Sequence, residues 1–207
     1  MRLNRLEKHL ATAAVAAGLA GAANAAIITW NINAAVPATL DGLYIKIDTQ
    51  QFTSLAGTNL PGWDINPYGS TTMNFYASAT APNPATTYVR TQASGGPSNL
   101  AAGTVVGASS VFANSTTAVI SSAGAGANGW SLNSVNYFGF RFHNNTTNAI
   151  NYGYGVMQLG ASATSRTLLA IVYGDAGESV TVGAIPAPGA IALLGVAGLA
   201  AGRRRRA

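Results

Sequence analysis

Histidine and cysteine are the first residues to check for chemistry, and this chain has few of either. It contains His9 and His143 and no cysteine. A nucleophilic serine working with His143 would be expected on a Gly-x-Ser-x-Gly turn, and that motif is absent. His143 directly precedes an Asn/Thr-rich turn at 144–148. We therefore expect an exposed turn histidine without a catalytic role.

Asp175 and Glu178 are the best-placed pair of carboxylates. A glycosidase holds two carboxyl groups about 5 to 9.5 Å apart across a sugar cleft. Here the two acids flank Ala176 and Gly177. This composition is more typical of a solvated turn. No catalytic residue, and no enzyme activity, is predicted.

Sugar binding is indicated by an aromatic stretch at 62–69. Trp63 and Tyr68 lie on a Gly/Pro-rich segment with Asp64 between them. An aromatic face beside a carboxylate can hold a pyranose ring, which makes these three residues a candidate glycan contact. The competing interpretation is structural: Trp63 caps one end of the core, and Asp64 bonds the backbone of its own turn.

Calcium is the one cofactor that the sequence leaves open. Calcium prefers oxygen ligands, and such ligands occur on or near predicted turns. They do not form an Asp-x-Asp-x-Asp loop, so no metal or other cofactor is predicted. The residues concerned are Asp41, Asp48, Asp64 and Asn66.

Short strands are predicted throughout residues 26–183. Apolar side chains alternate with polar ones in residues 26–33, 43–48 and 136–143. Gly, Asn and Pro turns separate these stretches, and 62–69 is predicted to be turn rather than strand. We expect an all-β domain, a single antiparallel β-sandwich of jelly-roll-like type. The apolar positions on one face of each strand are Ile28, Trp30 and Ile32; Leu43, Ile45 and Ile47; and Phe138, Phe140 and Phe142.

The first 25 residues have the pattern of a signal peptide. A basic start is followed by an alanine-rich apolar helix and then by Ala23-Asn24-Ala25. Signal peptidase cuts after such small-x-small sequences, so Ala26 is the predicted mature N-terminus. Export is therefore expected.

Residues 184–207 form a second targeting segment. Pro186, Ala187 and Pro188 make a hinge, an apolar helix follows, and Arg203, Arg204, Arg205 and Arg206 come next. From Pro188 to Gly202 the helix would be about 22 Å long, shorter than the bilayer core of about 30 Å. Because arginine clusters stay on the cytoplasmic side, the tail would halt there transiently.

This tail resembles the PEP-CTERM sorting tail of exported bacterial proteins. The resemblance covers the hinge, the short helix and the arginine cluster, with Ala187 where the family motif has Glu. It implies an exosortase-like processing enzyme and matrix polysaccharide as partners. A plain C-terminal membrane anchor is the alternative.

Charge is concentrated at the two ends. The whole chain carries a formal charge of +5, but residues 26–188 carry slightly more acids than bases. No basic patch with interleaved aromatics occurs there, so nucleic acid is not an expected partner. The sequence predicts an exported, non-enzymatic surface or matrix protein, with a carbohydrate-binding module as the alternative. The charged residues between the ends are Lys46, Arg90, Arg141, Arg166, Asp41, Asp48, Asp64, Asp175 and Glu178.

Overall fold

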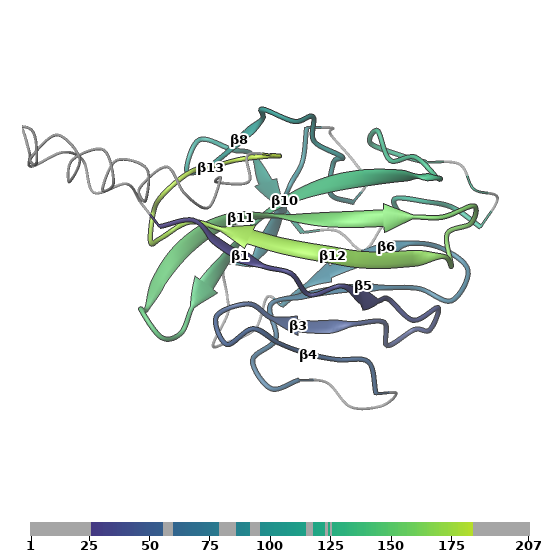
Figure 1. The fold of residues 1–207 in the computed structure, drawn as a ribbon, viewed down its shortest axis with the longest axis horizontal. Helices are drawn as coiled ribbons and strands as arrows, with labels where there is room; N and C mark the ends of the chain where they lie inside the picture. The colour runs from purple at the N-terminus through teal and green to yellow at the C-terminus, as the bar shows by residue number, and fades with distance from the viewer. Residues whose placement is uncertain are drawn as a thin grey trace, which may run out of the picture.

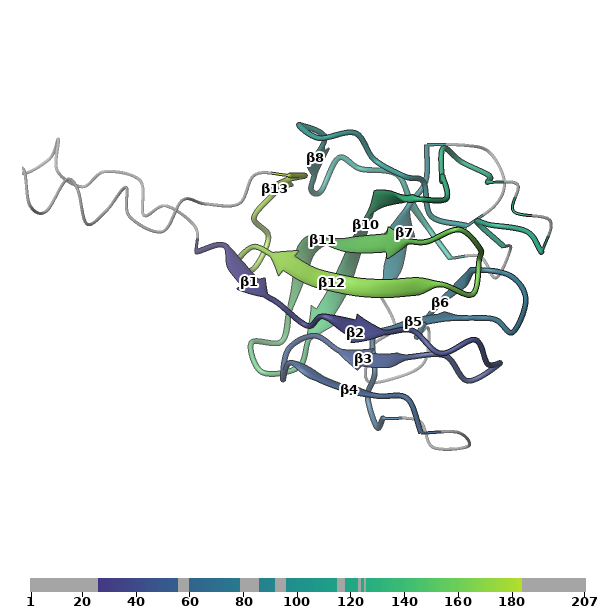
Figure 2. The ribbon, with the colours of Figure 1, turned by 45° about the vertical axis from the view of Figure 1, so that its right-hand side comes forward.

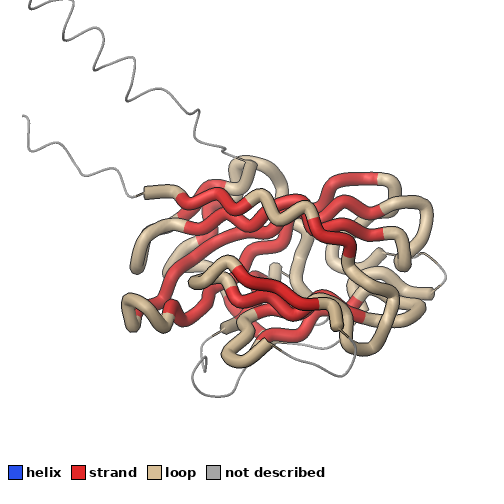
Figure 3. The backbone as a smooth tube through the Cα atoms, turned by 60° about the horizontal axis from the view of Figure 1, so that its bottom comes forward, coloured by secondary structure: helices blue, strands red, loops and turns tan. Residues whose placement is uncertain are grey.

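The computed structural model describes residues 26–55, 60–78, 86–91, 96–114, 118–122, 124 and 126–183. These residues form strands and loops without a helix (Figure 3). Within these ranges no helical segment has the length and apolar character needed to cross a bilayer. The predicted signal helix and tail helix lie outside the described residues.

Two antiparallel sheets make up most of the fold (Figure 1). The larger has seven strands in the order β1-β12-β11-β10-β7-β9, with β2 also paired to β12. The smaller has the order β4-β3-β5-β6. The larger sheet contains β1 (Ile28–Trp30), β2 (Ala34–Ala35), β7 (Thr87–Val89), β9 (Phe112–Ala113), β10 (Ser134–Asn144), β11 (Ala149–Leu159) and β12 (Arg166–Tyr173). The smaller contains β3 (Tyr44–Lys46), β4 (Gln51–Thr53), β5 (Ile65–Tyr68) and β6 (Asn74–Ala77).

The main core lies between these two sheets. Alternation along each strand sends every second side chain inward, and Leu43, Ile45 and Ile47 are all 0% exposed. Ile28 and Trp30 pack against the same core, and Ile32 belongs to it. The predicted inward faces of these stretches are therefore confirmed, as is an all-β antiparallel fold of sandwich type.

Glycines in β11 make room for the phenylalanines of β10. Phe138 pairs with Gly155 and Phe140 with Gly153. A Cβ atom on Gly155 would lie 2.1 Å from Phe138 Cζ, closer than atoms can approach. Glycine is therefore required at these positions of β11, because only a residue without a side chain leaves room for the phenylalanine rings in the core.

A second, smaller core lies on the opposite face of the large sheet. A ribbon of β8 (Val105–Val106) and β13 (Val180–Thr181) covers part of that face (Figure 2). Val106, Val180 and Val182 from the ribbon region pack with Tyr154 and Val172 of the sheet. The groove described below lies beside this ribbon, on the same face of the large sheet.

The prediction of a turn over 62–69 is confirmed at its start, where the Trp63 backbone N–H donates to the Leu60 carbonyl at 3.0 Å, but it was wrong for residues 65–68. Residues 65–68 form β5, which lies between β3 and β6. Pro67 has no N–H to donate, but its carbonyl accepts a hydrogen bond from the Leu43 backbone at 3.0 Å. Pairing with both neighbours overrides the local turn signals of glycine and proline.

Candidate functional site

Trp63 lies on the outer surface of the small sheet. Its ring contacts Tyr44, with centroids 5.3 Å apart, and Tyr76, with centroids 5.6 Å apart. Tyr76 alternates with the buried Phe75 and Ala77 and is 41% exposed. We call Tyr44, Trp63 and Tyr76 the aromatic patch. The structural interpretation predicted that Trp63 caps one end of the main core. In the structure, Trp63 instead packs on the outer face of the small sheet.

Asp64 does not share this surface. It is 1% exposed, and its carboxylate accepts a hydrogen bond from the Ile47 backbone N–H at 2.7 Å. Burial raises the pKa of Asp64 to about 7, against the opposing effect of the Ile47 bond. The bond joins two strands of the small sheet rather than closing the turn of Asp64. This carboxylate is placed to hold the sheet together and not to meet a ligand at the surface.

Tyr68 is separate from the aromatic patch. The rings found beside Trp63 are those of Tyr44 and Tyr76. Tyr68 is half-buried at the end of β5, and its carbonyl accepts a bond from Arg166 Nη1 at 3.3 Å. The structure thus replaces the predicted set of Trp63, Asp64 and Tyr68 by a purely aromatic cluster.

Three of the four candidate calcium ligands, Asp48, Asp64 and Asn66, bond main-chain groups through their side chains. Asp48 Oδ2 accepts from the Asn145 backbone at 3.2 Å, and Asn66 Nδ2 donates to the Asp41 carbonyl at 2.9 Å. In the described ranges, no three His, Cys, Asp or Glu side chains gather where they could hold a metal ion. The carboxylates of Asp48 and Asp64 instead accept bonds from backbone N–H groups.

The side chains of His143 and Asp175 likewise contact other groups of the protein. His143 was predicted to be exposed in a turn, but it is half-buried near the end of β10, just before the turn. Its Nδ1 lies 3.2 Å from Asn145 Oδ1. Asp175 Oδ2 accepts a bond from the Ala26 backbone N–H at 2.9 Å. Glu178 is exposed in the same turn as Asp175. Each of these contacts is one that a structural side chain would make.

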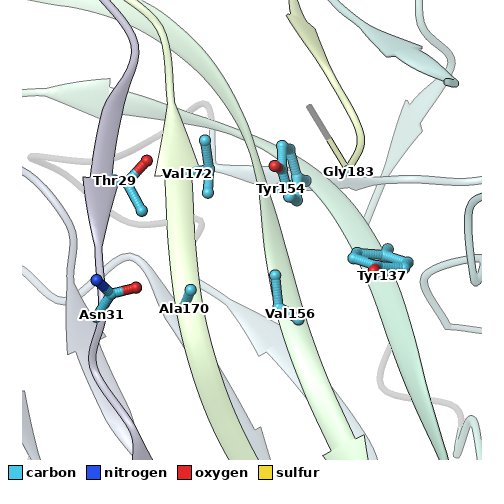
Figure 4. Close-up of a pocket in the computed structure, with 8 residues that line it drawn as sticks. All are labelled: Thr29, Asn31, Tyr137, Tyr154, Val156, Ala170, Val172 and Gly183. Atoms are coloured by element: carbon cyan, nitrogen blue, oxygen red, sulfur yellow. The ribbon is translucent and has the colours of Figure 1, made fainter. Parts of the chain in front are cut away.

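A groove of about 300 Å³ lies on the outer face of the large sheet (Figure 4). We call it the outer groove. It crosses β1, β12, β11 and β10 beside the end of the β8–β13 ribbon. In Figure 4 the side chains form two rows across these strands. Its lining residues are Thr29, Asn31, Tyr137, Tyr154, Val156, Ala170, Val172 and Gly183.

Sequence reasoning did not identify this groove. Its side chains occupy the alternate positions of strands whose other face fills the main core: Thr29 beside Trp30, and Tyr137 beside Phe138. The alternation did indicate that these positions face away from the main core. Which strands lie side by side was the missing information.

The targeting residues are mostly outside the described part of the chain. Ala23 and Ala25 of the predicted cleavage site lie there, as do the hinge and the arginine cluster. Ala26, the predicted mature N-terminus, is described and exposed. The structure therefore places only the residue on the mature side of the predicted cut. The residues outside are Ala23, Ala25, Pro186, Ala187, Pro188, Arg203, Arg204, Arg205 and Arg206.

No family model, curated protein or solved structure matches this chain.

Proposed function

We propose that this chain is an exported, non-enzymatic protein of the cell envelope or extracellular matrix. Its described domain would act structurally or adhesively as a single jelly-roll-like β-sandwich, flanked by a signal helix and a short tail helix. The observation that carries this proposal is the distribution of charge: cations crowd both ends, whereas the middle is almost neutral. Basic ends of this kind serve in membrane targeting.

The proposed order of events follows from the two ends. Signal peptidase removes residues 1–25 during export, and the domain folds outside. The apolar tail then stops in the membrane with its arginines on the cytoplasmic side. An exosortase-like enzyme cuts near the Pro186–Pro188 hinge and releases the protein from this transient membrane stage.

Intact-mass spectrometry of the native protein, fraction by fraction, tests this proposal. The expected mature form begins at Ala26 and lacks Arg203 to Arg206. A matched variant with all four arginines replaced by glutamine should accumulate in an unprocessed form. A full-length arginine tail on protein from purified membranes would support a permanent anchor. Recovery of a chain with an uncut N-terminus from the cytosol would refute export altogether.

Carbohydrate binding is the second candidate function, favoured by the aromatic patch. Tyrosine and tryptophan rings on a sheet surface offer flat faces for stacking against sugars, and Trp63 is flanked by Tyr44 and Tyr76. In a glycan array, Trp63→Ala should remove binding through this patch. Phe52→Ala is the matched control, because Phe52 is an exposed aromatic that packs on Trp30 instead. Equal glycan binding by both variants would exclude the patch.

A further inference from the structure

We propose that the outer groove binds an uncharged carbohydrate. The inference rests on the carbohydrate-binding alternative above but assigns it to a different surface. The aromatic patch belongs to the small sheet, whereas the outer groove lies on the face of the large sheet that points away from the small one. The two sites can therefore be separated by mutation.

Unused hydrogen-bonding groups are the first support for this proposal. Within the described part of the chain, the side chains of Thr29, Asn31 and Tyr137 form no hydrogen bond with another protein group, so they are open to a ligand. All three line the groove, where they provide hydroxyl and amide groups that can both donate and accept. A ligand rich in hydroxyl groups would complement them.

The apolar floor is the second support. Val156, Ala170 and Val172 lie between the polar residues of β1 and the tyrosines of β10 and β11 (Figure 4). A sugar ring has an apolar C–H face and hydroxyls around its edge. Binding sites that combine an apolar surface with a few placed polar groups suit such ligands.

Charge restricts the ligand further. None of the eight lining residues is Asp, Glu, Lys, Arg or His. Burial raises the pKa of Tyr154, so its hydroxyl stays neutral at ordinary pH. Without a charged group, the groove offers nothing that would repay the desolvation of a charged sugar. A neutral glycan is therefore favoured over a uronic acid or a sulfated one.

The shape of the groove indicates its direction. In Figure 4, Asn31 and Tyr137 stand at opposite ends of one row, with Ala170 and Val156 between them. This row crosses four adjacent strands, and three spacings between strands make about 14 Å. An oligosaccharide lying across the strands could therefore contact both ends, and the ring of Tyr137 offers a stacking surface at one of them.

Titration of the mature protein with neutral and acidic oligosaccharides, followed by calorimetry and amide NMR shifts, tests the proposal. We expect a neutral oligosaccharide to bind and to shift the amides of β1, β12, β11 and β10. Asn31→Ala and Tyr137→Ala should each weaken binding at least tenfold, while Tyr137→Phe, which keeps the ring, should weaken it less. Phe52→Ala, an exposed aromatic outside both sites, is the matched control and should bind with unchanged affinity, and Trp63→Ala is titrated in parallel to detect any binding through the aromatic patch.

Each other outcome contradicts the groove assignment in a distinct way. Binding lost in Trp63→Ala but retained in Asn31→Ala would assign the glycan to the aromatic patch. Preference for acidic oligosaccharides would overturn the neutral ligand class. Absence of binding to every oligosaccharide would remove both glycan sites, yet it would leave the export proposal intact, because that depends on the mature mass alone.

Discussion

Arg166 and Asp64 are two charged side chains buried in one sandwich, and they are accommodated differently. Arg166, at the start of β12, is 4% exposed and still charged at neutral pH, although burial lowers its pKa to about 10. Asp64, beside β5, is 1% exposed, and burial raises its pKa to about 7. One buried charge is therefore kept at neutral pH, whereas the other is close to losing it.

The difference lies in the number of dipoles that face each group. The Arg166 guanidinium donates to six backbone carbonyls, from Val36, Pro37, Tyr68, Gly69, Thr72 and Ala163, over distances of 2.6 to 3.3 Å. A guanidinium has five N–H donors in a planar fork, which suits several acceptors at once. Asp64 can only accept, and its pKa shows that the bonds it accepts do not offset its burial.

Replacing Arg166 should have the largest effect. Its carbonyl partners come from three separate segments of chain, so Arg166→Met would leave several buried acceptors without a donor. We expect the free energy of unfolding to fall by about 3–5 kcal/mol, because each buried acceptor left without a donor costs about 1–3 kcal/mol. Urea denaturation measures this loss.

Arg141→Met on β10, which β11 separates from β12 in the large sheet, is the matched control. Arg141 is half-buried, and it bonds Thr87 Oγ1 at 2.9 Å and lies over the ring of Phe112. We expect it to cost less than about 1 kcal/mol, as for exposed charge contacts. Similar losses of unfolding free energy in the two variants would show that the carbonyls around Arg166 do not stabilise the fold more than the contacts of Arg141 do. That result would contradict the proposed difference between Arg166 and Asp64.

Asp64 should give the next largest effect, and it should depend on pH. Because the folded pKa of about 7 is well above the ordinary pKa of an aspartate, the native state binds the proton more tightly. This contribution to stability is therefore complete below pH 4 and is lost as the pH rises through 7. A pKa difference of this size corresponds to about 4 kcal/mol.

Asp64→Asn removes the titrating group while keeping an oxygen for the Ile47 N–H. Urea titrations at pH 5 and pH 8 should show the native protein losing stability relative to this variant as the pH rises. Both proteins contain the same other titrating groups. The effects of those groups therefore cancel when the free energies of unfolding of the two proteins are subtracted. A difference that stays constant between the two pH values would show that Asp64 is ionised in the fold, like Arg166.

Alternation of side chains was sufficient to predict the main core but not the roles of these charges. The inward faces around Ile45 and Phe140 follow from local period-two patterns, which need no knowledge of the fold. The partners of Arg166 lie about 100 or more positions earlier in the chain, apart from Ala163, and they are carbonyls that every residue possesses. Sequence patterns carry no signal for such contacts.

The candidate site divides in the same way. Trp63 was identified from its residue type, and it does lie in an aromatic cluster. Its partner Tyr44, however, was read only as an alternating strand residue, since the pairing of β3 with β5 is a property of the sheet. The outer groove needs the order β1-β12-β11-β10, which no local pattern specifies.

Asp175 provides the exposed counterpart to the two buried charges and should have the smallest effect. It accepts a bond from Ala26 N at 2.9 Å, and Ala26 is the predicted mature N-terminus. A cut before Ala26 would turn this amide donor into an ammonium group and the contact into an ion pair. Exposed ion pairs contribute about 0.2–1 kcal/mol.

A double-mutant cycle can isolate so small an effect. Asp175→Asn is made in the chain that begins at Ala26 and in a chain that retains Ala25, where the ammonium group is displaced by one residue. The substitution should lower the melting temperature more in the first chain, and 1 M salt should remove the difference, because salt screens exposed charges. Equal shifts in both chains would show that Asp175 does not receive the mature terminus. A coupling free energy larger than the loss of unfolding free energy in Arg166→Met would show that the exposed charge stabilises the fold more than the buried one, which contradicts the expected order.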